Sequence, residues 1–166
     1  MTDSAVAGEQ GQQLLVAVHA HLRDELEQLR QVIRDVRRGA TEPAEARSYL
    51  NTMAMRQNYW TLGAFCANYC RVLSLHHAIE DQRMFPDLRQ GDESLGPVLD
   101  RLAAEHEVIA GVLDEVDRAL VAMVTDETRL DQTEEAVDRL ADVLLAHLQD
   151  EEDALLGPIG RLGLSI

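Results

Sequence analysis

The sequence contains no lysine, and its 15 arginines are outnumbered by 30 aspartates and glutamates among 166 residues. The formal net charge is therefore −15, and the calculated pI is about 4.6. Phosphate backbones and anionic lipid headgroups repel a surface of this sign. We therefore expect neither nucleic acid nor a membrane as a partner.

Long apolar runs are missing as well. No stretch approaches the roughly 20 apolar residues that a membrane-spanning helix needs. The N-terminal stretch MTDSAVAGEQ has no basic segment followed by an apolar one, which is the pattern of a signal peptide. We expect a cytoplasmic protein, in which Cys66 and Cys70 are small core residues rather than part of a disulfide framework.

Signals of β-structure are also absent. The chain has no runs in which β-branched residues alternate with polar ones, and no Asn-Gly turns of the kind that join hairpins. Hydrophobic residues make up 46% of the chain, enough for a packed core, and they recur at the three-four spacing of amphipathic helices. This pattern predicts an all-α protein.

Four segments carry the helical spacing, and breaker residues mark where three of them stop. The segments cover about residues 12–38, 41–88, 97–124 and 131–157. Gly39 is predicted to end the first segment and Phe85-Pro86 the second, while Gly157-Pro158 is predicted to end the fourth. The short stretches between the segments favour antiparallel neighbours, so the sequence predicts an up-down-up-down four-helix bundle.

Two further features refine this prediction. Asp131 and Glu134 have the spacing of a capping box at the start of the fourth helix. The second helix is long for a globular protein, so we expect a kink or a break near Gly63. The predicted organisation is a flexible tail over 1–11, the bundle over 12–160 and a second tail over 161–166.

Four of the six histidines fall on the apolar faces of these helices, one on each helix. They are His19, His76, His106 and His147. If about three positions in seven face the core, four histidines would all land there by chance with a probability of about 0.03. The alternative is a set of separately hydrogen-bonded core histidines. One histidine from each helix favours a shared ligand, whereas His21 lies off the apolar face and is expected to be exposed.

Two glutamates share these faces. Glu80 lies four residues after His76, and Glu151 lies four residues after His147. Side chains four apart on a helix are neighbours on one face, so imidazole and carboxylate can converge on one ion or on two adjacent ions. Buried carboxylates are normally paired with a cation or bound to a metal. The set therefore fits one or two divalent transition metal ions with nitrogen and oxygen ligands.

The motifs around these residues resemble those of the hemerythrin-like, or HHE cation-binding, family of non-haem di-iron proteins. The matching stretches are HAHLRDEL, HHAIEDQRMFPDL, EHEVIAGVL and HLQDEEDALLGP, in the order of the family and over nearly the whole chain. The resemblance implies a four-helix bundle that holds two iron ions bridged by two carboxylates. It implies Glu80 and Glu151 as the bridges, His19 and His76 as ligands of one iron, and His106 and His147 as ligands of the other.

The sequence departs from the oxygen carriers of the family at two places. These proteins have a second histidine four residues after the first in the third helix, where this chain has Ala110. Their last carboxylate is an aspartate five residues after its histidine, whereas here Glu151 follows at four. His77 is a candidate to replace the missing imidazole, because it lies about 100° around the helix from His76. Glu105, a water molecule or another group would otherwise fill that place.

The leading functional interpretation is a di-iron protein that binds dioxygen or a related diatomic ligand as a carrier, store or sensor. It would act as a monomer or homodimer with an unidentified redox partner. The altered ligand set keeps an enzyme as the alternative, in which the same centre consumes hydrogen peroxide or reduces nitric oxide. A second alternative is a module that holds a single metal ion or a structural zinc. The sequence does not separate iron from manganese or a mixed-metal centre.

Several polar residues near these positions are expected to have ordinary roles. Asp81, Asp150 and Glu152 are predicted to point into solvent, and so is Glu105 unless it binds metal. Tyr69 lies two turns before His76 and is read either as core filler or as a hydrogen-bonding neighbour of a ligand.

Overall fold

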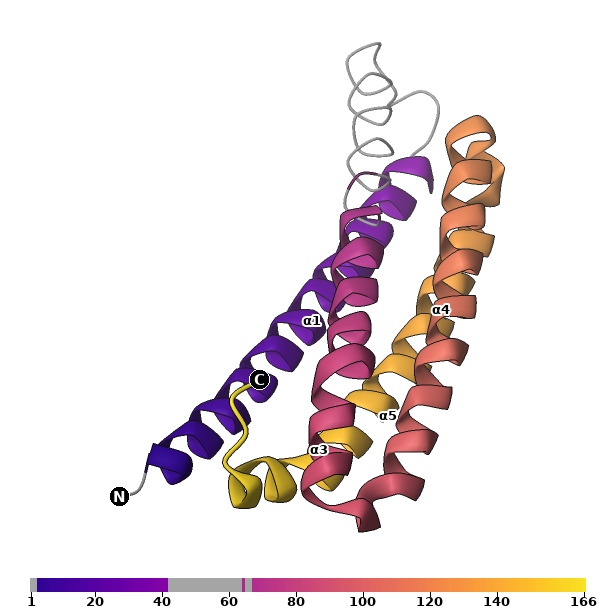
Figure 1. Cartoon of the computed structure of the whole chain (residues 1–166). Coiled ribbons are helices and arrows are strands. Elements are labelled where there is room, and N and C mark those ends of the chain that lie inside the picture. Colours follow the sequence, from indigo (N-terminus) through magenta and orange to yellow (C-terminus); the bar gives the residue numbers. More distant parts are fainter. Residues whose placement is uncertain (1–2, 42–63, 65–66) are drawn as a thin grey trace.

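The computed structural model describes residues 3–41, 64 and 67–166, and this part of the chain is helical without strands (Figure 1). The prediction of an all-α protein is confirmed. The main elements are α1 (Asp3–Thr41), residues 67–79, the π-helical turn η2 (Glu80–Met84), α3 (Phe85–Gly91), α4 (Gly96–Thr125) and α5 (Leu130–Leu162). None of the described helices is apolar enough over a sufficient length to cross a bilayer.

Successive arms of the bundle run in opposite directions (Figure 1). Helix α1 forms the first arm, residues 67–91 the second, α4 the third and α5 the fourth. The 3-10 turns η3 (Glu93–Leu95) and η4 (Glu127–Arg129) provide the short connections before α4 and α5. Helix α5 packs against both α1 and α4. The described residues therefore confirm the up-down-up-down arrangement.

Helix α1 begins at Asp3, so it includes most of the segment that was predicted to be a flexible tail. Two glycines allow its first turns to approach the end of the chain. A Cβ atom at Gly8 would lie 2.6 Å from the carbonyl oxygen of Gly160, and one at Gly11 would collide with the carbonyl oxygen of Leu164. The amide of Gln12 also donates a hydrogen bond of 2.5 Å to the carbonyl of Leu156. These contacts extend the helix beyond the point where its apolar pattern begins.

Both ends of α5 differ from the prediction. Pro158 lies inside the helix, which continues to Leu162 and stops at Gly163, a residue with a φ of 66°. The fully buried Ile159 anchors the turn after the proline in the core. The predicted capping box is wrong, because the side chains of Asp131 and Glu134 bind Arg37 of α1 instead of the first turn of α5.

The second arm contains its irregular turn next to the histidines. The π-helical turn η2 begins at Glu80, and the predicted kink near Gly63 lies outside the described residues. The Phe85-Pro86 pair does not end the helix as predicted. Proline is tolerated in the first turn of α3, where its missing N–H would have no partner within that helix. The arm therefore continues to Gly91.

The core is divided into two apolar clusters. The larger cluster includes Leu22, Leu73, Ile109 and Leu144, and the smaller one includes Leu15, Met84, Leu102 and Leu155. On every arm the predicted ligands lie in sequence between a residue of one cluster and a residue of the other. The polar centre is therefore enclosed by apolar layers, which exclude water from it.

Tyr69 belongs to the larger cluster and contacts the backbone of α1. Its hydroxyl donates a hydrogen bond of 3.0 Å to the carbonyl of Leu22, and its side chain is 1% exposed. We expect Tyr69→Phe to lower the free energy of unfolding by about 1 kcal/mol, because one buried hydrogen bond is lost. Urea titration measures this change. Metal content should stay at the wild-type value, and a loss of metal would show that the hydroxyl supports the centre.

Candidate metal centre

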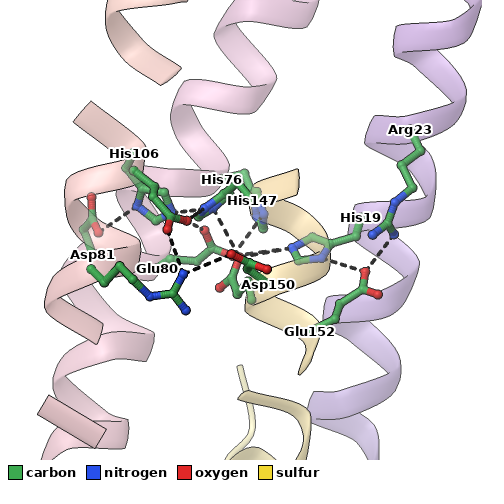
Figure 2. A network of polar contacts seen from close by, with 12 residues as sticks. His19, Arg23, His76, Glu80, Asp81, His106, His147, Asp150 and Glu152 are labelled. Atoms are coloured by element: carbon green, nitrogen blue, oxygen red, sulfur yellow. Dashed lines mark hydrogen bonds and ion pairs between the residues drawn. The ribbon is translucent and has the colours of Figure 1, made fainter. Parts of the chain in front are cut away.

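Seven side chains from all four arms converge in the middle of the bundle. Figure 2 labels five of them, which are His19, His76, Glu80, His106 and His147. Six of the seven are buried, with exposed fractions of 6% or less, and the side chain of His76 is 11% exposed. The seven are His19, His76, His77, Glu80, His106, His147 and Glu151. These are the residues that the sequence analysis selected as metal ligands. The structure brings them together, and their binding of metal stays a prediction.

The seven side chains form two adjacent groups. The first ligand group consists of His19, His76, Glu80 and Glu151, and the second ligand group consists of His77, His106 and His147. Within each group the candidate ligand atoms all lie within 4.8 Å of one another. Two groups of this size match two metal positions rather than one.

The second arm contributes to both groups because His76 and His77 point in different directions. Successive residues of a helix are rotated by about 100°. His76 therefore faces His19, at a ring-centroid distance of 5.2 Å, while the ring of His77 stacks on that of His106 at 4.0 Å. Ala110, where the oxygen carriers have a histidine, is exposed and contributes nothing to the centre. His77 thus supplies an imidazole from a different helix.

The two glutamates lie between the groups. Glu80 places Oε1 3.0 Å from Nε2 of His76 and Oε2 3.5 Å from Nε2 of His106. Oε2 of Glu151 lies 3.5 Å from Nε2 of His19 and 3.6 Å from Nε2 of His147. Each carboxylate therefore contacts at least one imidazole of each group, which is the placement that two bridging ligands need.

Three of the imidazoles are held from behind by other carboxylates. Nδ1 of His19 lies 2.9 Å from Glu152, that of His106 lies 2.9 Å from Asp81, and that of His147 lies 2.8 Å from Glu105. An ionised carboxylate only accepts hydrogen bonds, so each Nδ1 is the donor. The prediction that Glu152 points into solvent is therefore wrong. Asp81 is exposed as expected, but its carboxylate also binds His106. Glu105 is half-buried and lies behind His147 instead of among the ligand groups.

These three contacts follow a general rule for histidines that bind metal. Histidines that bind metal usually donate their other N–H to a carboxylate or a carbonyl. Glu152 and Asp81 each follow a predicted glutamate ligand directly, and Glu105 directly precedes His106. This position beside a predicted ligand is the sequence feature from which their role could have been predicted. Of the remaining predictions, His21 is exposed as expected, and Asp150 is exposed and paired with Arg101.

The donor set fits metal ions because its inward-facing atoms lack other partners. Nε2 of His19, His76 and His77 and both carboxylate oxygens of Glu80 and Glu151 are buried without a hydrogen bond. Buried polar atoms are otherwise almost always paired. Nε2 of His106 and Nε2 of His147 lie 3.0 Å apart. Both rings use Nδ1 as the donor to a carboxylate, so in the neutral rings these two Nε2 atoms carry lone pairs that a shared cation would stabilise.

The pKa values of the metal-free centre indicate which of its groups carry a proton before a metal ion binds. Burial raises the pKa of Glu151 and lowers the pKa of His77 to about 2. Burial also lowers the pKa of His19, but Glu151 and Glu80 outweigh it and raise the value to about 9. At neutral pH His19 is therefore protonated and partly balances the carboxylates. Metal binding displaces this proton, so it is coupled to proton release.

The family model described as the hemerythrin HHE cation binding domain matches residues 10–159. The matched range includes all seven side chains of the two ligand groups. Comparisons with curated proteins and with solved structures gave no match. The family model and the unpartnered donors point independently to bound metal.

Proposed function

The chain belongs to the hemerythrin HHE cation-binding family, and we propose on this premise that it holds two iron ions which bind dioxygen or a related diatomic ligand. Membership makes it a metal-binding domain. The proposal adds the number of ions, their identity and the ligand. It assigns the protein the role of an oxygen carrier, store or sensor.

One observation carries this proposal: two adjacent groups of buried, unpartnered donors have two carboxylates between them. The first ligand group would hold one ion and the second ligand group the other. Glu80 and Glu151 would bridge the ions, because each already contacts an imidazole of both groups. Imidazole and carboxylate together suit iron among the divalent transition metals.

The two positions differ in the number of protein donors. With both carboxylates shared, the first position has two imidazoles, His19 and His76, and the second has three. The first position therefore has fewer protein donors and more room for an external ligand. His76, the most exposed ligand side chain, belongs to this position. We propose that the diatomic ligand binds there.

The two iron ions, when bound, supply the electrons for reversible binding of the diatomic ligand. The protein excludes water from the centre and orients the imidazole rings. Its apolar clusters keep water away from the centre, and the carboxylates behind His19, His106 and His147 fix the direction of three rings. A dry, closed centre favours a small uncharged ligand over an ionic one.

The visible spectrum of the iron-loaded protein tests this proposal. Protein reduced without oxygen and then exposed to air should gain visible absorption, and renewed reduction should remove it. His147→Ala, which removes a donor of the second ligand group, should lose much of this signal. A protein that stays colourless after iron loading and exposure to air contradicts the proposal. Rapid loss of added hydrogen peroxide, absent in His147→Ala, would instead support the enzymatic alternative.

A further inference from the structure

Two similar chains of contacts reach the centre from the surface. In the first, Nδ1 of His19 on α1 binds Glu152 of α5, whose carboxylate accepts a hydrogen bond of 2.7 Å from Arg23 of α1 (Figure 2). In the second, Nδ1 of His147 on α5 binds Glu105 of α4, which accepts a hydrogen bond of 3.0 Å from Arg101. One chain ends in the first ligand group, and the other ends in the second.

In each chain the glutamate connects two helices. Glu152 joins α5 to α1, and Glu105 joins α4 to α5. The arginine reduces the freedom of the glutamate side chain and balances its charge. The glutamate in turn accepts the Nδ1 proton of the histidine and leaves Nε2 as the atom that faces the centre. The orientation of each ring is therefore set before any metal binds, and in a neutral ring the glutamate also sets the tautomer.

We propose that Glu152 and Glu105 are positioning residues, each of which holds one histidine in its metal-binding form and thereby controls the affinity of one of the two metal positions. This inference rests on the proposed function for the presence of two metal ions. The effect on the histidine tautomer does not depend on metal. The two parts can therefore be tested separately.

The two glutamates use their oxygens differently, and this difference predicts unequal effects of the same substitution. Oε1 of Glu152 accepts from both His19 and Arg23. The single carbonyl oxygen of glutamine can do the same, so Glu152→Gln retains both hydrogen bonds. Glu105 instead uses Oε2 for His147 and Oε1 for Arg101.

Glu105→Gln cannot retain both contacts. If its amide oxygen faces His147, its NH2 group faces Arg101, which only donates hydrogen bonds. If the oxygen faces Arg101, the NH2 group faces Nδ1 of His147. Nδ1 must then accept, and the proton moves to Nε2, the atom that would bind metal. Glu105→Gln should therefore shift His147 partly to the Nε2–H tautomer.

Nitrogen-15 NMR of the metal-free protein reads out this tautomer. His147 is expected as the Nδ1–H form in the wild type and as a mixture in Glu105→Gln. Glu107→Gln is the matched control, because Glu107 is an exposed residue on the same helix and the substitution removes the same charge. It should leave the spectrum of His147 unchanged. A wild type with His147 mainly in the Nε2–H form overturns the proposal.

Titration with Co²⁺, followed by calorimetry and by the visible bands of the bound ion, reads out the two affinities. In Glu105→Gln one of the two binding steps should weaken by about 10- to 100-fold, the usual effect of losing such a partner. The other step should stay within about twofold of the wild type. In Glu152→Gln the affected step should weaken less, by under about tenfold, because its hydrogen bonds are retained.

The outcomes separate this inference from the proposed function. Equal weakening of both steps in Glu105→Gln, or no weakening at all, overturns the positioning role while leaving the metal centre intact. A larger effect for Glu152→Gln than for Glu105→Gln also contradicts it. A wild type that binds neither Co²⁺ nor Fe²⁺ overturns the proposed function, and the tautomer spectra then decide the role of Glu105 alone.

Discussion

Replacing Glu151 by glutamine is expected to abolish tight binding of both metal ions and to make the metal-free protein more stable by about 1–3 kcal/mol, the usual cost of burying a polar group that is incompletely paired. Metal binding fails because one of the two carboxylates shared by the ligand groups loses its charge. Stability rises because the carboxylate is fully buried, and its raised pKa shows that burial costs more than the contacts with His19 and His147 return. Glutamine has nearly the same shape without this charge.

The pH dependence of this gain has a definite sign. Burial raises the pKa of Glu151 above its ordinary value of 4.5, so in the folded protein it holds its proton more tightly than in the unfolded chain. Folding stability is therefore lost as the pH rises above 4.5, and glutamine avoids this loss. The gain from Glu151→Gln should be small in acid and appear above that pH.

Urea unfolding of the chelated proteins at several pH values measures the effect. Glu107→Gln is again the control, because it removes one negative charge from an exposed position. If Glu151→Gln is less stable than the wild type without metal, the carboxylate is stabilised by its histidine neighbours and the argument from burial is wrong. If it still binds two metal ions tightly, Glu151 is not a shared ligand.

Removal of both metal ions is expected to lower the melting temperature by roughly 15–30 °C. Metal that binds only the folded chain stabilises it by about 4 kcal/mol per site at a free concentration 1,000 times the dissociation constant. In a domain of this length each kcal/mol corresponds to about 2–4 °C. This affinity arises because the donors of the empty centre lack hydrogen bonds in an apolar surrounding and gain a partner when metal binds.

Calorimetric scans of iron-loaded and chelated protein test this expectation. The melting temperature of Glu151→Gln should not respond to the chelator, since this variant has no tightly bound metal to lose. A wild-type melting curve that the chelator leaves unchanged would contradict a buried centre in which metal binding and folding are coupled.

The four histidines on the apolar faces could be predicted from the sequence because helical spacing alone decides which residues face the core. His19, His106 and His147 recur with the leucines of their helices, and the structure buries all three. Glu80 and Glu151 follow by the same spacing. The antiparallel order of the last three arms followed from the short connections η3 and η4 between them. This part of the architecture depends only on local periodicity and chain length.

The residues behind the ligands could not be predicted in this way. Whether Glu105 reaches His147 depends on how α4 is rotated and shifted against α5, and periodicity within one helix carries no such information. The ends of the helices were uncertain for a similar reason. Pro158 lies inside α5 because Ile159 is anchored in the core. Asp131 binds Arg37 because α1 extends alongside the start of α5.

Metal analysis of the freshly purified protein, after loading with Fe²⁺ without oxygen and removal of the excess, tests the central claim most directly. Imidazoles and carboxylates from all four arms should retain two iron ions per chain, and Glu151→Gln should retain neither. A chain that retains one zinc ion and no iron, or that holds no metal at all, would contradict the account.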